Sequence, residues 1–184
     1  MSLLDRIIEK DTELFVYLNG LGVESWDSFW LTVTDKYTWI PMYILLAILL
    51  VHYFKWKKAL LYLLVAALLV AFTDQFVNLI KNTVGRLRPC NDPNLQDYIR
   101  ILKHSGGKSF VSGHATNSFA VSTFMILVFK KHFKYIYLIL IWPLLFAYSR
   151  IYVGVHFPVD IFFGMLLGIG IGFSFYKISR VLIK

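Results

Sequence analysis

The chain has 184 residues, of which 58% are hydrophobic and 17% aromatic, and its mean hydropathy is +0.62. A soluble domain of this length is far less apolar, so the composition indicates a membrane protein. The formal net charge is +8, yet the basic residues fall in short runs between apolar stretches. This distribution speaks against a nucleic-acid partner and favours contact with an anionic lipid bilayer.

The N-terminal segment, residues 1–35, alternates apolar side chains at helical spacing with acidic and basic ones. This pattern predicts an amphipathic helix that lies in the membrane interface, followed by a short aromatic segment around Trp26 to Trp30. A partial sixth span in this region stays open. Acidic residues interrupt any apolar run near the start, so we expect no signal peptide here.

Five later segments approach the roughly 17–25 apolar residues that a spanning helix needs, and lipid tolerates no open sheet edge. They cover about residues 38–54, 59–80, 113–129, 135–151 and 157–177. We therefore expect an all-α membrane protein, a bundle of five to six transmembrane helices in which residues 1–184 form a single domain. The glycines of the last segment, spaced four apart from Gly164 to Gly172, favour close packing against a neighbouring helix of the same chain.

Charge asymmetry predicts the orientation of these helices. The connections 55–58 and 130–134 and the tail from Lys177 onward carry basic residues and no acid. By the positive-inside rule, these ends face the cytoplasm. The long connection 89–111, rich in turn residues, is then an extracytoplasmic loop. The protein is expected to be multi-pass in the cell (inner) membrane, with its outer helix ends facing the periplasm or the exterior.

Three polar clusters lie at those outer ends, and the first reads Lys81-x6-Arg88-Pro89. Ionisable groups at membrane depth are energetically costly, so the presence of these two cations suggests that they belong to a functional site. Arg86 lies between them, and headgroup snorkelling explains it as readily as a role in a site. No role is assigned to His104 or Lys108 on the following loop.

The second cluster is Ser112-Gly113-His114, a glycine-containing turn that opens into the third span. Backbone N–H groups at a helix start, with the Ser112 hydroxyl, form a cradle for an anion. His114 projects from this cradle, where it can donate a proton to an ester oxygen. A serine nucleophile assisted by His114 is a competing interpretation, although neighbours in sequence seldom reach that geometry.

The third cluster reads Ser149-Arg150-x5-His156-x3-Asp160. His156 and Asp160 are four apart near Pro158, so both can lie on the first turn of the fifth span. A carboxylate bonded to one ring nitrogen fixes the tautomer and leaves the other nitrogen free to attack. Arg150 adds a planar fork suited to bidentate phosphate binding. The alternative is a His-Asp cap on an interfacial helix.

Cations combined with histidines indicate a phosphate ester as the ligand. A metal site is disfavoured because carboxylates are few and the single cysteine, Cys90, offers no ligand spacing, and no cofactor is expected.

In this order and at these spacings, the three motifs over residues 81–160 resemble those of the type-2 phosphatidic acid phosphatase superfamily. That family includes membrane lipid phosphatases, soluble acid phosphatases and vanadium haloperoxidases. One departure is Val111, which stands where the family most often has proline before the serine. The departure affects the turn more than the chemistry, since no catalytic atom is lost.

The resemblance implies that Lys81, Arg88 and Arg150 hold the phosphate oxygens. Ser112 and the backbone N–H of Gly113 complete this phosphate-binding group.

The resemblance also implies the roles of the remaining residues. His156, oriented by Asp160, attacks phosphorus to form a phosphohistidine, His114 protonates the leaving group, and water then hydrolyses the intermediate without a metal.

We therefore expect an integral membrane lipid phosphatase that hydrolyses a lipid phosphomonoester or pyrophosphate at the outer face. Candidate substrates are undecaprenyl pyrophosphate, phosphatidylglycerophosphate, phosphatidate and a lipid A phosphate. The alternatives are a non-enzymatic transporter or scaffold whose polar residues line a path, and a vanadate-dependent haloperoxidase-like enzyme that shares the site. The expected partners are a lipid phosphate and the bilayer, with no nucleic acid, and the oligomeric state stays open.

Overall fold

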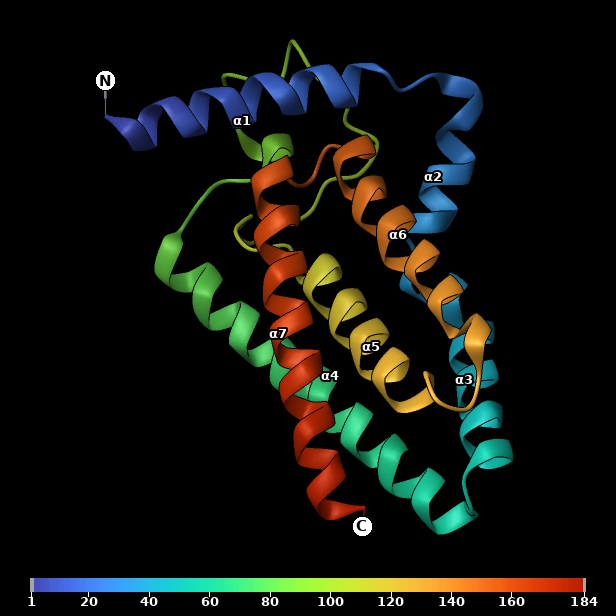
Figure 1. Ribbon diagram of the computed structural model, residues 1–184. Helices are drawn as coiled ribbons and strands as arrows, with labels where there is room; N and C mark the ends of the chain where they lie inside the picture. Colours follow the sequence, from blue (N-terminus) through green and yellow to red (C-terminus); the bar gives the residue numbers. More distant parts are fainter. Residues whose placement is uncertain (1, 184) are drawn as a thin grey trace.

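The structure is a computed structural model that describes residues 2–183, and within that range all its regular elements are helical (Figure 1). The α-helices are α1 (Leu3–Gly20), α2 (Asp27–Thr34), α3 (Ile40–Tyr53), α4 (Trp56–Val84), α5 (Gly113–Phe129), α6 (Ile141–Tyr152) and α7 (Pro158–Leu182). Short 3-10 turns at Lys36–Trp39 and Lys134–Leu140 lead into α3 and α6. The predicted all-α class is confirmed.

Helix α5 lies in the middle of the bundle, among α4, α6 and α7 (Figure 1). Most of its side chains are buried, whereas the other long helices keep broad apolar faces exposed. The glycines of α7 allow it to lie close to α5, because a Cβ on Gly164 would stand 2.9 Å from the carbonyl oxygen of Ser112. The predicted intramolecular packing of this glycine stripe is therefore present.

Four helical stretches in the described part of the chain are long and apolar enough to cross a membrane. They are Lys36–Tyr53, Trp56–Val84, Lys134–Tyr152 and Pro158–Leu182, and they coincide with four of the five predicted spans. The remaining predicted span, residues 113–129, is α5, which has the predicted bounds but only 17 residues. Because α5 is central in the bundle, its apolar side chains pack mainly against other helices of the chain.

Helix α4 extends beyond the predicted apolar span 59–80: it includes Lys81 and ends at Val84. Gly85 then ends it with φ at 70°, a left-handed conformation that glycine adopts without strain. Helix α7 starts at Pro158, whose fixed φ suits a first helical position.

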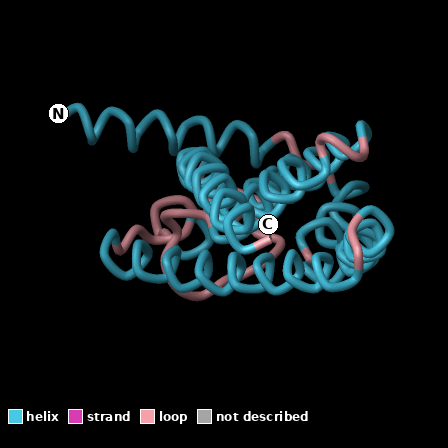
Figure 2. The backbone as a smooth tube through the Cα atoms, turned by 60° about the horizontal axis from the view of Figure 1, so that its bottom comes forward, coloured by secondary structure: helices cyan, strands magenta, loops and turns pink. Residues whose placement is uncertain are grey.

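Helix α1 runs crosswise over one end of the bundle in both views (Figure 1, Figure 2). The ring of Phe15 packs edge-on against that of Phe157, with centroids 5.2 Å apart. The side-chain amide of Asn19 donates hydrogen bonds to the carbonyl oxygens of Ile151 and Tyr152 at 3.1 and 3.0 Å. α1 is thereby fixed over the junction between α6 and α7, in the region where the sequence predicts an amphipathic helix.

The connection between α4 and α5 covers the same end of the bundle. As predicted, it is irregular apart from a short 3-10 turn at Pro89–Asn91 and a few hydrogen-bonded turns. Arg100 ties it to the N-terminal region through an ion pair with Asp27 at 2.8 Å, and the backbone N–H of Leu102 donates to the carbonyl oxygen of Val153 at 3.3 Å. The starts of α5 and α7, the end of α6 and this loop therefore meet beneath α1.

Candidate active site

His156 and Asp160 meet at the start of α7, as their spacing predicts. Oδ2 of Asp160 accepts a hydrogen bond from the backbone N–H of Phe157 at 2.9 Å, which caps the first turn of α7. The same oxygen lies 3.4 Å from Nδ1 of His156. Both side chains are buried, with 1% and 0% of their surface exposed. The carboxylate therefore caps the helix and also orients a buried imidazole.

The other ring nitrogen of His156, Nε2, lies 3.0 Å from Nη1 of Arg88. A guanidinium only donates, so Nε2 accepts and carries no proton, and the proton of the neutral ring is on Nδ1 beside Asp160. Burial, followed by the positive charges of Arg88, Arg150 and Lys81, lowers the pKa of His156 well below its usual value of 6.5. The ring is thus neutral at neutral pH, and the lone pair on its Nε2 accepts the hydrogen bond from Arg88.

Arg88 and Lys81 are both held by backbone carbonyl groups. Nε of Arg88 donates to the carbonyl oxygen of Gly106 at 3.0 Å, and its Nη1 donates to that of Val155 at 3.1 Å. Nζ of Lys81 donates to the carbonyl oxygen of Lys108 at 2.6 Å. These neutral acceptors orient both side chains without cancelling their charge.

Arg150 ends α6 with 2% of its surface exposed, and its Nη1 donates to the hydroxyl of Thr34 on α2. Its Nε is buried and has no hydrogen-bond partner within residues 2–183. A buried donor left without a partner is costly, and a phosphate oxygen would satisfy it. The carbonyl oxygen of Arg150 also accepts from the backbone N–H groups of Val155 and His156, at 3.0 and 3.3 Å. The two motif residues are therefore joined through the backbone.

Ser112 is the N-cap of α5, and its hydroxyl accepts from the backbone N–H of Ala115 at 3.4 Å. The backbone N–H of Ser112 donates to the carbonyl oxygen of Asp160 at 3.1 Å, which brings the cradle beside the start of α7. Ser112 is fully buried and caps its own helix, so the serine-nucleophile interpretation loses its basis.

The sequence places His114 in the first turn of α5, directly after Gly113, the first residue of this helix. Its imidazole packs against Phe146 of α6, with ring centroids 4.9 Å apart, and the residue is partly exposed. This position lies beside the site without a direct bond to His156, so the role of His114 as an acid stays a prediction.

Ser109 belongs to the site, although no sequence pattern singled it out. It is fully buried, its hydroxyl donates to Oδ2 of Asp160, and the hydroxyl oxygen lies 3.4 Å from Nδ1 of His156. Its carbonyl oxygen accepts from Lys81 Nζ at 3.2 Å. Ser109 therefore links the pair His156 and Asp160 to Lys81.

Arg86 and Asp11 form a second group that supports Asp160. Nη1 of Arg86 donates to Oδ1 of Asp160 at 2.9 Å, and its Nη2 donates to Oδ2 of Asp11 at 2.7 Å. The guanidinium carbon lies 3.8 Å from the ring centroid of Phe157, and 19% of the side chain is exposed. The snorkelling interpretation of Arg86 is therefore wrong.

Asp11 comes from α1 and has 4% of its surface exposed. Its Oδ1 accepts from the backbone N–H of Val159 at 2.8 Å. Burial raises the pKa of Asp11, and the hydrogen bonds from Val159 and Arg86 oppose that rise. The N-terminal helix thus contributes a buried carboxylate to the surroundings of the catalytic pair.

A similar fold occurs in a solved structure, the crystal structure of a transmembrane PAP2-type phosphatidylglycerolphosphate phosphatase from Bacillus subtilis. The TM-score is 0.75, with 96% of this chain and 87% of that chain covered, and the sequences are 21% identical. At this level of identity, the likeness shows the fold alone.

Two curated relatives align over most of the chain. A lipid A 4'-phosphatase from Bacteroides thetaiotaomicron is 36% identical over 184 residues, which cover 98% of this chain and 81% of the relative. An undecaprenyl-diphosphatase from Sulfolobus acidocaldarius is 34% identical over 163 residues, covering 88% and 71% respectively. Residues 58–184, which contain all three motifs, match the model of the PAP2 superfamily. The chain therefore belongs to the PAP2 superfamily and is, like these relatives, a phosphatase.

Proposed function

We propose that this phosphatase hydrolyses a phosphate monoester of a glycolipid of the lipid A type. The reaction proceeds through a phosphohistidine on His156 and without a metal. The observation that carries the proposal is the buried pair of His156 and Asp160, in which the unprotonated Nε2 of His156 lies 3.0 Å from Nη1 of Arg88. A neutral imidazole beside fixed cations suits attack on a phosphate ester. The unpartnered Nε of Arg150 supports the same ligand.

In the proposed reaction, Nε2 of His156 attacks phosphorus, a P–N bond forms and the P–O bond to the lipid breaks. His114 gives its proton to the departing oxygen. A water molecule, deprotonated by His114, then attacks phosphorus, the P–N bond breaks, and inorganic phosphate leaves with His156 neutral again. Asp160 stabilises the positive charge that the imidazole ring acquires while it carries the phosphoryl group.

The three cations act on the phosphoryl oxygens, where charge spreads in the transition state. In the proposal, Lys81 and Arg88 exchange their carbonyl acceptors for these oxygens, and Arg150 adds its free Nε. Ser112 and the backbone N–H of Gly113, at the start of α5, bind a further oxygen because helix N-termini attract anions.

The proposed membrane arrangement follows from the charges at the two ends of the bundle. We place α5 as a fifth span beside the four longer stretches, and α1 in the interface, where its exposed Leu3, Leu4, Ile7 and Ile8 contact lipid. The catalytic end then faces the periplasm or exterior of the cell membrane, because the acid-free basic connections lie at the other end.

The lipid A phosphate is favoured among the candidate substrates by the relative that aligns over 98% of the chain at 36% identity. The second relative, an undecaprenyl-diphosphatase, favours a prenyl pyrophosphate instead. Both substrates present a phosphate at the membrane surface to the same cations, so the phosphate-binding residues do not indicate which substrate the protein prefers. A comparison of the turnover of the two lipids distinguishes them.

The test is phosphate release by the purified protein in detergent from lipid A, undecaprenyl pyrophosphate, phosphatidylglycerophosphate and phosphatidate. We expect the highest kcat/KM on lipid A, with loss of only one phosphate. The His156→Ala variant should lose at least about 1000-fold in kcat, because no nucleophile remains. His52→Ala is the matched control, since His52 is exposed on α3 and outside the site.

Two results would contradict the proposal. Retention of wild-type turnover by His156→Ala would remove the phosphohistidine mechanism. A higher kcat/KM on undecaprenyl pyrophosphate would leave the mechanism in place and reject the lipid A substrate. Quenching into alkaline denaturant, in which the P–N bond of phosphohistidine survives, should trap radiolabelled phosphate from the substrate on the wild-type protein and on His52→Ala, but not on His156→Ala.

A further inference from the structure

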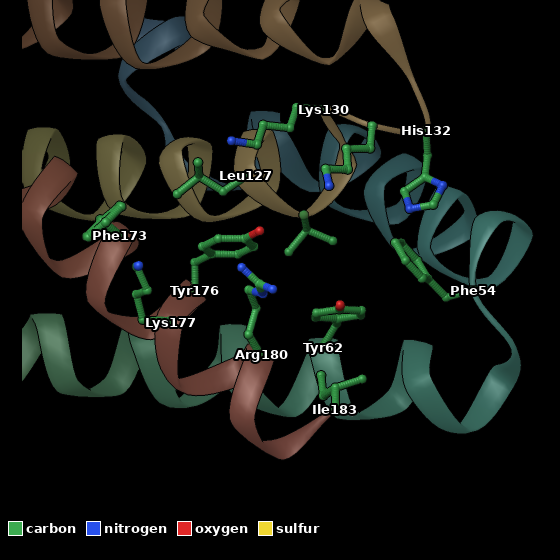
Figure 3. A pocket seen from close by; sticks show the side chains of 12 residues that line it. Phe54, Tyr62, Leu127, Lys130, His132, Phe173, Tyr176, Lys177, Arg180 and Ile183 are labelled. Carbon is green, nitrogen blue, oxygen red and sulfur yellow. The ribbon is translucent and has the colours of Figure 1, made fainter.

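A cavity of about 620 Å³ lies between α4, α5 and α7 at the end of the bundle opposite the catalytic pair. Figure 3 shows Tyr62, Tyr176 and Arg180 gathered between these helices, with Lys130 and His132 above them on the connection that follows α5. Binding pockets for small ligands span roughly 300–1,000 Å³, so this volume is ample for a lipid headgroup.

The charge of this cavity is positive. Lys130, Lys131, Lys177 and Arg180 line it together with His132. Within the described residues, none of these side chains forms an ion pair with a carboxylate. The sequence explains why, since no acid lies between residues 36 and 73, between 98 and 159, or after Asp160.

The remaining walls are aromatic and aliphatic. Phe54 comes from the connection between α3 and α4, and Phe173 lies on α7 with Nζ of Lys177 5.3 Å from its ring centroid. Tyr62 and Tyr176 add hydroxyl groups beside the cations. Cations, phenol hydroxyls and apolar rings together match a group that is anionic at one end and greasy at the other.

This cavity is separate from the catalytic site. Helix α5 carries Ser112 and Gly113 at its start and Lys130 directly after its end. Its 17 residues span about 25 Å at a rise of 1.5 Å per residue, so one phosphate cannot contact both ends. A ligand of this cavity therefore belongs to the opposite membrane leaflet.

We propose that this cavity binds the phosphate headgroup of an anionic phospholipid from the leaflet opposite the catalytic site. Snorkelling accounts for basic residues at a helix end, but it does not require them to line a common cavity. Lys57 and Lys58 provide the comparison, since they lie at the same end of the bundle at the start of α4 and do not line the cavity. The inference stands independently of the substrate proposed above.

The test is native mass spectrometry of the full chain in detergent, titrated with phosphatidylglycerol, with phosphatidylcholine, or with inorganic phosphate. We compare Lys177→Gln/Arg180→Gln with the matched control Lys57→Gln/Lys58→Gln, which removes the same charge from the same end. Each basic residue near a lipid phosphate increases the binding affinity about fivefold. Loss of two such residues should therefore raise the Kd of the tightest phosphatidylglycerol site about 25-fold in the first variant. The control should stay within about twofold of the wild type.

Lys130→Gln/Lys131→Gln gives a second variant on an exposed connection, for the case that the α7 substitutions impair folding. It should weaken the same site by a similar factor, and phosphate release should stay at the wild-type rate in every variant. Equal weakening in the lining variants and the Lys57/Lys58 control would overturn the proposal, as would equal binding of phosphatidylcholine. Displacement of phosphatidylglycerol by millimolar inorganic phosphate would show a site for the free anion instead.

Discussion

Replacing Asp11 by asparagine tests whether α1 takes part in catalysis. Oδ2 of Asp11 accepts from Arg86 at 2.7 Å and Oδ1 accepts from the N–H of Val159 at 2.8 Å. An asparagine keeps the bond to Val159 through its oxygen but then turns its amide N–H₂ toward Nη2 of Arg86. Two donors would face each other, and Arg86 would lose one of the two carboxylates that fix it.

The magnitude follows from the kind of bond that is lost. A hydrogen bond between charged groups contributes about 1.5–3 kcal/mol to stability. Because the other end of Arg86 binds Asp160 at 2.9 Å, we expect part of this loss to appear as misplacement of the catalytic carboxylate. If the whole loss of about 1.5–3 kcal/mol raises the free energy of the transition state, kcat falls by about 10- to 150-fold, because about 1.4 kcal/mol corresponds to a factor of ten. KM should change little, since Asp11 does not contact the phosphate-binding cations.

The assay is steady-state phosphate release per mole of folded protein, with thermal unfolding in detergent as the second measurement. Glu13→Gln is the matched control on the same helix. Glu13 is 56% exposed and pairs only with Lys10, so its loss should change kcat by less than about twofold. Equal kcat values for the two variants would refute the reasoning. A fall in stability alone, with unchanged kcat, would make Asp11 a folding residue and not a positioning residue.

Four further outcomes are expected. Because burial and nearby cations lower the pKa of His156, the acid limb of kcat/KM should lie below pH 6.5 after correction for the substrate phosphate, and a limb at or above 6.5 would contradict the lowered pKa of this nucleophile. The same residue should lower stability as pH falls below about 6.5, since the unfolded chain takes up the proton and the folded chain does not. Arg150→Lys should lose at least about tenfold in kcat/KM, because an ammonium cannot replace the planar fork, whereas a transport path would tolerate it. Gly168→Ala should lower the unfolding temperature, since the added Cβ would overlap the carbonyl oxygen of Thr116, while Gly170→Ala meets open space and should be neutral or slightly stabilising.

The parts of the fold that could be predicted from sequence are those encoded by local patterns. The apolar segments predicted where the long helices lie, and for α5 the bounds agree at both ends. In contrast, α6 begins only at Ile141, after a 3-10 stretch at Lys134–Leu140, and α7 continues beyond the predicted end at 177 to Leu182. The pair His156 and Asp160 was predictable because a separation of four residues places two side chains on one helical turn. The predicted span 59–80 lies within α4, which runs from Trp56 to Val84 and has Gly85 as its C-cap.

The supporting contacts could not be predicted, because they join distant parts of the chain. Arg86 and Asp11 are 75 residues apart, and Arg150 and Thr34 are 116 apart. In an amphipathic helix, a buried acid such as Asp11 has the same sequence pattern as the solvated acids beside it. Ser109 lies in an irregular loop, where no periodicity shows which side chain faces inward. Only the tertiary packing distinguishes these residues.

The distribution of carboxylates explains why four basic residues near His156 divide into two roles. Arg86 binds the two buried carboxylates of Asp11 and Asp160, so its charge is neutralised and it serves to position them. Lys81 and Arg88 instead donate to uncharged carbonyl oxygens. A cation held by neutral acceptors keeps its attraction for an incoming anion, whereas one paired with carboxylates does not.

Arg150 falls into the same group as Lys81 and Arg88, because it donates to the hydroxyl of Thr34 and its Nε has no hydrogen-bond partner within the described residues. This division supports the proposal that the three motif cations bind phosphate, and it separates them from Arg86, which spacing along the chain alone could not do. It also explains why the net positive charge of the site persists although two acids lie within it. The fold brings both acids to Arg86, and within residues 2–183 it leaves Lys81, Arg88 and Arg150 without a carboxylate partner, as binding of an anionic substrate by these cations requires.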